Sequence, residues 1–327
     1  MAHKFLTVSM SPHIRRGRTV RGMISTTILA LTPAMLFGFY QYGLEAVILV
    51  AVGVAGAVAT EAALCLVRKQ PLTIGDHHAV LVGITLALLV PSGVPWWMVL
   101  VGAVMAILVG KAPFGPLGGA PINPALVGLL ILAISWPGEI GSYGYPTTAD
   151  AAYAVTDIAP AEAPVDAVTI DPSDAGEYCP FMLFSGFQVG AIGAISPVLL
   201  LLGGLFLIVQ RVGRWQGPLG FLLGLGLAGA IMHGIDPGAF PPGSFQLFTG
   251  MAFFGAFFLC NEWTSTPVTP WGLFLFGFGA GVLALIFRVT GGLPFGRVAF
   301  AIAFFSLLTP LLDRIAVTPF GKGVRHA

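Results

Sequence analysis

Long apolar runs alternate with short polar segments along almost the whole chain. Ten of them approach the roughly 17 to 25 residues that cross a bilayer, or fall short where Pro or Gly interrupts them. The runs are residues 23–41, 44–67, 78–91, 95–111, 124–137, 189–210, 217–234, 246–261, 271–288 and 295–312. The pattern therefore predicts an all-α integral membrane protein with about ten transmembrane helices.

The composition supports this fold class. Of the 327 residues, 56% are hydrophobic and only 9% are charged, which is more apolar surface than a soluble core can bury. The 44 glycines and 25 prolines are typical of membrane helices, which tolerate both residues better than soluble helices do. The net charge of +1 argues against nucleic acid as a partner.

A polar segment divides the ten spans into five and five. We expect residues 1–137 to form the first five-helix half, residues 138–188 an acidic external loop, and residues 189–327 the second half. The loop holds eight acidic residues and no Lys or Arg, and it is either a solvated connector or a site for a cation or a basic partner. Because each half has an odd number of spans, homologous halves must insert with opposite topology, so we expect two inverted repeats.

Basic residues indicate the orientation. Twelve of the 15 lysines and arginines lie near the same ends of the predicted spans: Arg15, Arg16, Arg18, Arg21, Arg68, Lys69, Lys111, Arg211, Arg214, Arg314, Lys322 and Arg325. With ten spans, all of them fall on one side, which the positive-inside rule assigns to the cytoplasm. Both termini are then cytoplasmic and the acidic loop is outside.

The stretch KAPFGPLGGAPINPALVG, residues 111–128, is a Gly- and Pro-rich elbow between two apolar runs. Non-helical backbone at membrane depth survives only where it is buried in protein or lines a cavity. One interpretation is a buried elbow on an ion path, formed by Gly118, Gly119, Pro121 and Asn123, with Asn123 as the N-cap of a helix that begins at Pro124. The other is an ordinary loop at the membrane surface.

Ionisable residues inside spans are costly, and each is a hypothesis for a functional site. Glu61 is the deepest acid, and Asp76 opens the third span beside His77 and His78. Glu61 either lies on an ion path or hydrogen-bonds a neighbouring helix. Adjacent histidines point about 100° apart on a helix, so they cannot chelate one metal from one face, and we expect no metal site.

The cysteines exclude two further kinds of site. The chain has only three of them, far apart and without a CxxC motif. Neither a zinc site nor an iron–sulfur cluster with all its ligands in this chain is therefore expected.

Several segments together resemble the RnfD and NqrB subunits of the Rnf and Nqr complexes. These segments are SPHIRRGRTVRGM, GDHHAVLVGITLALLVPSGVPWWMVLVGAVMAILVGK, GPLGGAPINPALVG, LFTGMAFFGAFFLCNEWTSTPVT and RVTGGLPFGRVAFAIAFFSLLTPLLDR. The resemblance is nearer to RnfD, and it implies a membrane subunit of a redox-driven Na⁺ or H⁺ pump that uses ferredoxin or NAD(H). It also implies other membrane, iron–sulfur and flavin subunits as partners, in a bacterial or archaeal cytoplasmic (inner) membrane.

The resemblance further implies an FMN joined by a phosphoester to a threonine of a Ser-Gly-Ala-Thr-like motif in the outer loop. The corresponding stretch here, VDAVTIDPSDAGE at residues 165–177, departs from that motif. Aligned through Pro172, Asp171 takes the place of the flavin-bearing threonine. We therefore expect no FMN there, with Thr169 as the remaining candidate hydroxyl and a non-covalent flavin as the alternative.

Two functions follow from these observations. In the first, the chain is one subunit of an ion-translocating oxidoreductase, does not catalyse a reaction alone, and conducts the ion past Glu61, Asp76 and the elbow. In the second, it is a stand-alone channel or transporter for a small solute, because a five-plus-five inverted bundle also serves transporters.

Overall fold

The computed structural model describes residues 19–69, 74–115, 118–141, 180–186, 188, 190–237, 240–290 and 296–315. In these residues no strand occurs, and the single isolated β-bridge joins Pro91 to Ala191. The prediction of an all-α membrane protein is confirmed.

Each predicted span of the first half coincides with a helix. The elements are α1 (Val20–Tyr42), α2 (Leu44–Val67), η1 (Ile74–Asp76), α3 (His78–Leu89), α4 (Trp96–Met105), η2 (Ala106–Lys111), η3 (Ala112–Phe114), α5 (Pro124–Ser135) and α6 (Pro137–Ile140). Helix α4 continues directly into η2, which is a π-helix, so that they form one span.

The second half follows the same plan. Its elements are α8 (Pro197–Val209), α9 (Gln216–Ile235), α10 (Gly243–Phe248), α11 (Ala252–Phe254), η6 (Gly255–Leu259), α12 (Pro270–Thr290) and α13 (Arg297–Ile315). The short helix α7 (Pro180–Ser185) precedes them, within the segment expected as the external loop. The predicted span at residues 246–261 is a broken helix made of α10, α11 and η6.

Five of the described helices are long and apolar enough to cross a membrane: α1, α2, Trp96–Phe114, α9 and α12. The apolar helices α3, α5 and α8 are shorter, at 12 to 13 residues. Their shortness leaves backbone groups near the helix ends that need partners inside the protein. The chain is thus a multi-pass membrane protein, whereas the relation of its halves by inverted symmetry stays a prediction.

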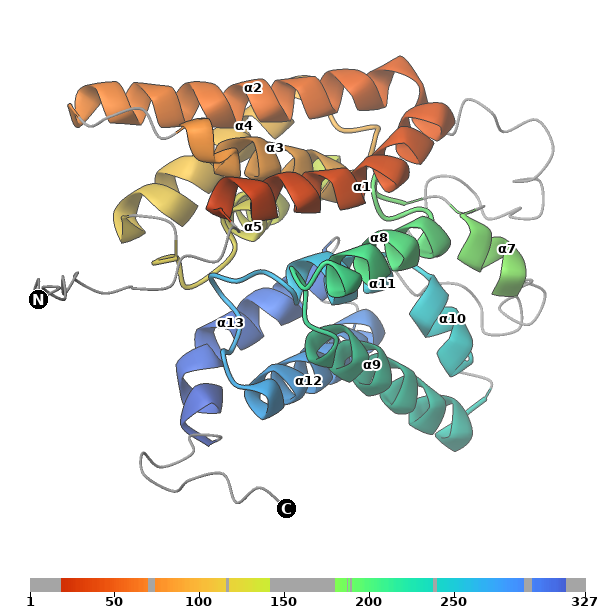
Figure 1. Ribbon diagram of the computed structural model, residues 1–327. Helices are drawn as coiled ribbons and strands as arrows, with labels where there is room; N and C mark the ends of the chain where they lie inside the picture. Colours follow the sequence, from red (N-terminus) through yellow and green to blue (C-terminus); the bar gives the residue numbers. More distant parts are fainter. Residues whose placement is uncertain are drawn as a thin grey trace, which may run out of the picture.

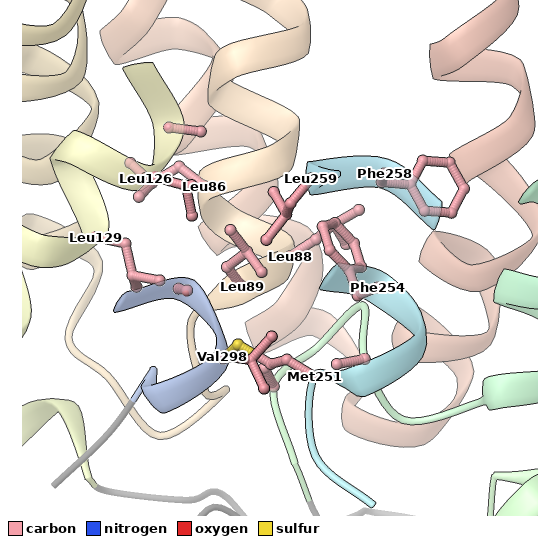
Figure 2. Packing of buried hydrophobic residues seen from close by; sticks show 14 of the residues in the cluster. Leu86, Leu88, Leu89, Leu126, Leu129, Met251, Phe254, Phe258, Leu259 and Val298 are labelled. Atoms are coloured by element: carbon pink, nitrogen blue, oxygen red, sulfur yellow. The ribbon is translucent and has the colours of Figure 1, made fainter. Parts of the chain in front are cut away.

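The two halves lie against each other along one face (Figure 1). Helix α1 packs on α8, and α5 packs on α13. A shared apolar core fills the junction, with Leu86, Leu88, Leu89, Leu126, Leu129, Met251, Phe254, Phe258, Leu259 and Val298 at its centre (Figure 2). We call these ten residues the apolar plug.

The segment before α8 completes the end of the short helix α3. The backbone N–H of Gly193 donates to the carbonyl of Leu88 over 2.8 Å, and that of Ile192 donates to Val90 over 3.2 Å. These bonds satisfy carbonyls that Pro91 would otherwise leave open, because a helix cannot continue normally through proline. A segment of the second half therefore finishes a helix of the first.

An arginine side chain donates hydrogen bonds to the backbone where the helix is broken between α10 and α11. Arg288 on α12 is buried, and its guanidinium donates to the carbonyl oxygens of Gln246 (2.6 Å) and Thr249 (3.0 Å). These carbonyls lie where α10 ends and Gly250 adopts a φ of 63°. Arg288 thereby supplies the hydrogen bonds that broken helical backbone needs in an apolar setting.

Candidate functional site

The polar groups of both halves meet in one cavity beside the apolar plug, which we call the interface cavity. It has a volume of about 40 Å³. Its polar lining comes from α1, α3 and α5 in the first half and from the loop after η6 in the second: Thr27, His78, Thr85, Asn123, Asn261, Glu262 and Thr264. A cavity needs about 10 to 15 Å³ for each water, so this one has room for about three.

Two further spaces adjoin the interface cavity. A cavity of about 90 Å³ beside Arg214 shares Val212, Asn261 and Trp263 with it. A cavity of about 10 Å³, the elbow cavity, shares His78 and Thr264 with it and reaches Lys111 and Gly118. The three spaces thus follow one another around the ends of α3 and η6.

Local sequence signals place the side chains of the first half. Asp76 accepts a hydrogen bond from the backbone N–H of His78 over 2.9 Å and so caps α3. Asn123 accepts from the N–H of Ala125 over 2.8 Å, with Pro124 at the first position of α5. Both caps satisfy orphan N–H groups at helix starts, and the predicted role of Asn123 as an N-cap is confirmed.

Glu262 is the main charged group that the second half contributes. Its carboxylate accepts from the hydroxyls of Thr264 (2.9 Å) and Ser265 (3.3 Å), and it also hydrogen-bonds Asn123 of α5. It lies in the loop after η6, outside the spanning helices. Burial raises the pKa of Glu262 to about 7, although the hydrogen bonds from Thr264, Ser265 and Asn123 pull the pKa down.

This pKa predicts a pH-dependent stability that Glu262→Gln removes. Between pH 4.5 and 7 the folded protein holds a proton that the unfolded chain releases, so the free energy of unfolding falls as the pH rises through this window. The expected change in the free energy of unfolding is on the order of 2 kcal/mol. It is smaller than the pKa difference alone would give, because part of the carboxyl faces the cavity. Thermal unfolding of the purified protein at pH 5.5 and pH 8 measures it. Equal pH dependence in wild type and Glu262→Gln would contradict the assignment.

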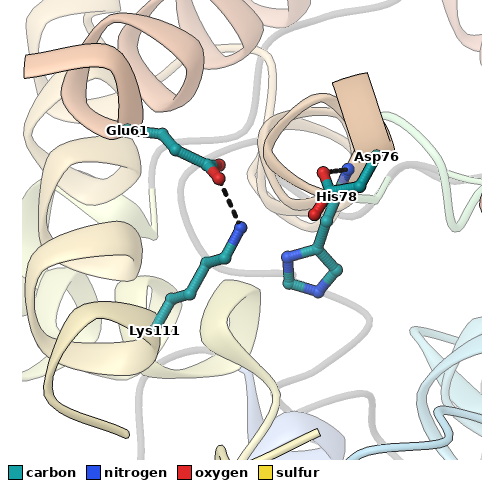
Figure 3. Close-up of polar contacts among 4 residues, drawn as sticks. All are labelled: Glu61, Asp76, His78 and Lys111. Atoms are coloured by element: carbon teal, nitrogen blue, oxygen red, sulfur yellow. Dashed lines mark hydrogen bonds and ion pairs between the residues drawn. The ribbon is translucent and has the colours of Figure 1, made fainter. Parts of the chain in front are cut away.

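Glu61 forms a buried ion pair. The ammonium of Lys111 lies 2.7 Å from a carboxylate oxygen of Glu61, and the two side chains are 14% and 5% exposed (Figure 3). The pair joins α2 to the end of η2. The structure thus favours the second interpretation of Glu61, a hydrogen bond to a neighbouring helix. Its partner, Lys111, also lines the elbow cavity.

The elbow is only partly buried. Asn123 and Pro124 are buried, whereas Gly118, Gly119 and Pro121 are exposed. The expectation of burial is therefore wrong for these three residues, because the elbow leaves the bundle at its end and returns only at the N-terminus of α5. Gly118 still lines the elbow cavity, and its φ of 107° suits a residue without Cβ.

Two predicted features lie outside the described residues. Thr169 is one of them, and the acidic loop beyond Gly141 up to residue 179 is the other. Within the residues that the structure describes, no cluster of three or more His, Cys, Asp or Glu side chains could hold a metal ion.

Sequence reasoning missed Glu262 and His78 as members of one site. Both were recognisable as ionisable residues at span ends, but nothing local shows that positions 184 residues apart face one cavity. Asn123 was recognised through its N-cap position, and Glu61 and Asp76 through their charge. In the structure, His78, Asn123 and Glu262 line the interface cavity, and His78 and Lys111 line the elbow cavity. Glu61 is paired with Lys111, and Asp76 accepts from the backbone N–H of His78.

Comparison with known proteins assigns the chain to a family. Residues 7–321 match the sequence profile of the NQR2, RnfD, RnfE family. The chain is 36% identical to the D subunit of the Na⁺-translocating ferredoxin:NAD⁺ oxidoreductase complex of Acetobacterium woodii, over 94% of this chain and 93% of that protein. It is 32% identical to the D subunit of the proton-translocating ferredoxin:NAD⁺ oxidoreductase complex of Clostridium ljungdahlii, over 98% and 97%.

A third relative has a more general name. The chain is 31% identical to the D subunit of the ion-translocating oxidoreductase complex of Yersinia enterocolitica, over 94% of this chain and 96% of that protein. The similarity therefore extends over nearly the full length of each relative. The chain belongs to the NQR2, RnfD, RnfE family.

Proposed function

We propose that this chain is the D-type membrane subunit of an Rnf complex, in which electron transfer from ferredoxin to NAD⁺, or the reverse, drives Na⁺ or H⁺ across the membrane. Membership of the family supports this function over a stand-alone transporter, because the related proteins are named as subunits of such complexes. The partners are the other membrane, iron–sulfur and flavin subunits. The chain does not catalyse the redox reaction by itself.

The interface cavity is the observation that carries the ion-translocating role. It collects polar groups of both halves at the junction, and Phe258 of the apolar plug (Figure 2) is also part of its lining. An ion can enter such a cavity with its water, and the plug blocks a continuous leak. Small changes in how the halves pack would open or close the plug, because both halves contribute to it.

The ion path that we propose passes Asn123 and Glu262 in the interface cavity and Asp76 and Glu61 beyond His78. Gly118, Gly119 and Pro121 form the exposed rim of the elbow at the cytoplasmic mouth of this path. The polar groups supply hydrogen bonds that replace part of the water around an ion.

The orientation follows from the charges. We place the interface cavity on the cytoplasmic side, since the basic residues at helix ends surround it. Arg68 donates to the carbonyl of Ala112, and Arg214 binds Asn261 and Val268. Both termini are then cytoplasmic and the acidic loop lies outside, in a bacterial or archaeal inner membrane.

We propose that the chain carries no FMN in the family's usual covalent position, because Asp171 stands there and cannot form the phosphothreonyl ester. Thr169 is the fallback attachment point. A non-covalent flavin is the alternative, and its three-ring isoalloxazine would need a larger site than the interface cavity, which has room for about three waters. We therefore expect the intact mass of the purified chain to equal that of the polypeptide. A mass increase that matches FMN and disappears in Thr169→Val would contradict this.

Reconstitution tests the proposed function. The tagged chain should copurify with iron–sulfur and flavin subunits, and liposomes that contain the complex should take up Na⁺ or H⁺ when reduced ferredoxin and NAD⁺ are added. An ionophore for the transported ion is the control, because it should abolish the gradient but not NADH formation. Solute uptake by the chain alone, without copurifying subunits, would favour the stand-alone transporter.

A further inference from the structure

His78 occupies the narrow point between two cavities. It is the first residue of α3, and its side chain lines both the interface cavity and the elbow cavity. Only 5% of the residue is exposed. Thr264 is the other residue that the two cavities share, so the imidazole and this hydroxyl lie where the cavities adjoin.

The imidazole has a buried nitrogen with no protein partner. Nδ1 of His78 makes no hydrogen bond, although it is shielded from bulk solvent. Leaving such a nitrogen unpaired is costly, and the cavities beside it have room for water. The bond from His78 N–H to Asp76 holds the start of α3 in place and leaves the ring free to exchange hydrogen bonds with that water.

Charged groups face His78 from several elements. Glu61 of α2, Asp76 of η1 and Lys111 of η2 lie within electrostatic range of the ring (Figure 3). Glu262 faces the same cavity from the loop after η6, while α1 and α5 contribute the neutral Thr27 and Asn123. An imidazole can accept a proton on one nitrogen and release one from the other, so it is suited to link carboxyl groups on its two sides.

We propose that His78 relays a proton between Glu262 and Glu61, so that the ion moved past this point is H⁺. The proposal rests on the ion-translocating function proposed above. A Na⁺ ion would need several oxygen ligands, whereas the residues that the two cavities share supply one imidazole and one hydroxyl, and the nearby Lys111 ammonium repels cations. A proton needs only a chain of hydrogen bonds.

The transfer conserves charge at each step. The O–H bond of the Glu262 carboxyl breaks and, through cavity water, an N–H bond forms at His78 Nδ1, which leaves a carboxylate and an imidazolium. Nε2 then gives up its proton to Glu61, which leaves a neutral imidazole and a carboxylic acid and weakens the ion pair with Lys111. Glu61 then passes its proton to water at the elbow and regains its ion pair with Lys111, which lines the elbow cavity. Water in the interface cavity supplies the next proton to Glu262, and proton exchange with cavity water restores the starting tautomer of His78. The reverse sequence moves a proton in the opposite direction.

The raised pKa of Glu262 fits its place in this path. A carboxyl with a pKa of about 7 is protonated in part of the population at neutral pH, so it can both take up and release a proton.

The test uses the whole complex in liposomes, driven by reduced ferredoxin and NAD⁺. A pH-sensitive dye reports H⁺ uptake, radioactive sodium reports Na⁺ uptake, and NADH absorbance reports electron transfer. His78→Gln and His78→Phe should lower the protons moved per NADH about a hundredfold, the lower range for removal of a positioned acid–base group. Wild-type flux should slow in D₂O, and the residual flux of His78→Gln should not.

The matched control is His77→Asn. His77 is the neighbouring residue, but its ring contacts Ser25 over 3.1 Å, and its φ of 64° is one that asparagine tolerates. This variant should keep the wild-type number of protons per NADH. His78→Gln retains a polar side chain of similar length, so copurification of all subunits shows that its defect is not one of assembly.

Three results would count against these ideas in different ways. Wild-type proton flux in His78→Gln would overturn the relay. Uptake of Na⁺ and not H⁺ by the wild-type complex would also overturn the relay, while the translocating function would stand. Electron transfer by the wild-type complex with no movement of either ion would overturn the proposed function itself.

Discussion

Replacing Glu61 by leucine alone should destabilise the protein by about 3 kcal/mol, near the lower limit for breaking a buried ion pair. The side chain of Lys111 is only 14% exposed, and in this variant its ammonium loses the carboxylate that now lies 2.7 Å away. A largely buried charge is then left without its partner. Thermal unfolding of the purified protein in detergent, at one fixed scan rate, measures the loss.

Two comparisons separate the ion pair from other effects. The double variant Glu61→Leu, Lys111→Met should recover most of the lost stability, because an apolar pair of similar volume replaces both charges. Glu45→Leu is the matched control, since Glu45 lies exposed in the first turn of the same helix α2. If Glu61→Leu unfolds at the wild-type temperature, the pair does not stabilise the fold.

Gly224→Ala should prevent the normal packing of α9 on α12 and strongly reduce the yield of folded protein. A Cβ atom built on Gly224 overlaps the backbone carbonyl of Phe278, and one on Gly277 overlaps that of Gly217. A backbone atom cannot move away by changing rotamer as a side chain can, so the two helices must separate. We expect this to lower the free energy of unfolding by about 3 kcal/mol or more. Size-exclusion chromatography and thermal unfolding report the effect.

Gly234→Ala on the same helix is the matched control. A Cβ atom there meets nothing within 4 Å, so alanine should be neutral or slightly stabilising through its higher helix propensity. A Gly224→Ala protein as stable and monodisperse as Gly234→Ala would show that close backbone approach is not needed between α9 and α12.

The spans were predictable because membrane insertion depends on local hydrophobicity. A bilayer requires apolar runs of a set length, and each of the ten predicted runs coincides with a helix or a broken helix. The start of α5 was predictable for a similar reason, since an Asn followed by Pro is a local signal for a helix N-terminus.

The candidate site was predictable only in part. Glu61 and Asp76 were predictable because charged groups are costly in a membrane, and Asn123 because it precedes Pro at a helix start. All three lie near the cavities. Burial of Gly118, Gly119 and Pro121 was wrongly expected, since the same Gly and Pro residues occur in buried elbows and in surface turns. Their local chemistry does not distinguish the two environments.

The sequence by itself determined that this is an all-α membrane protein with about ten apolar runs, because the cost of placing polar backbone and side chains in hydrocarbon acts on each segment separately. Only the tertiary structure decided that Lys111 neutralises Glu61 fifty residues away, and that His78 and Glu262 face one cavity. These contacts depend on how helices far apart in the chain pack around a shared apolar core. Packing of that kind is a collective result of many side chains, and no single motif encodes it.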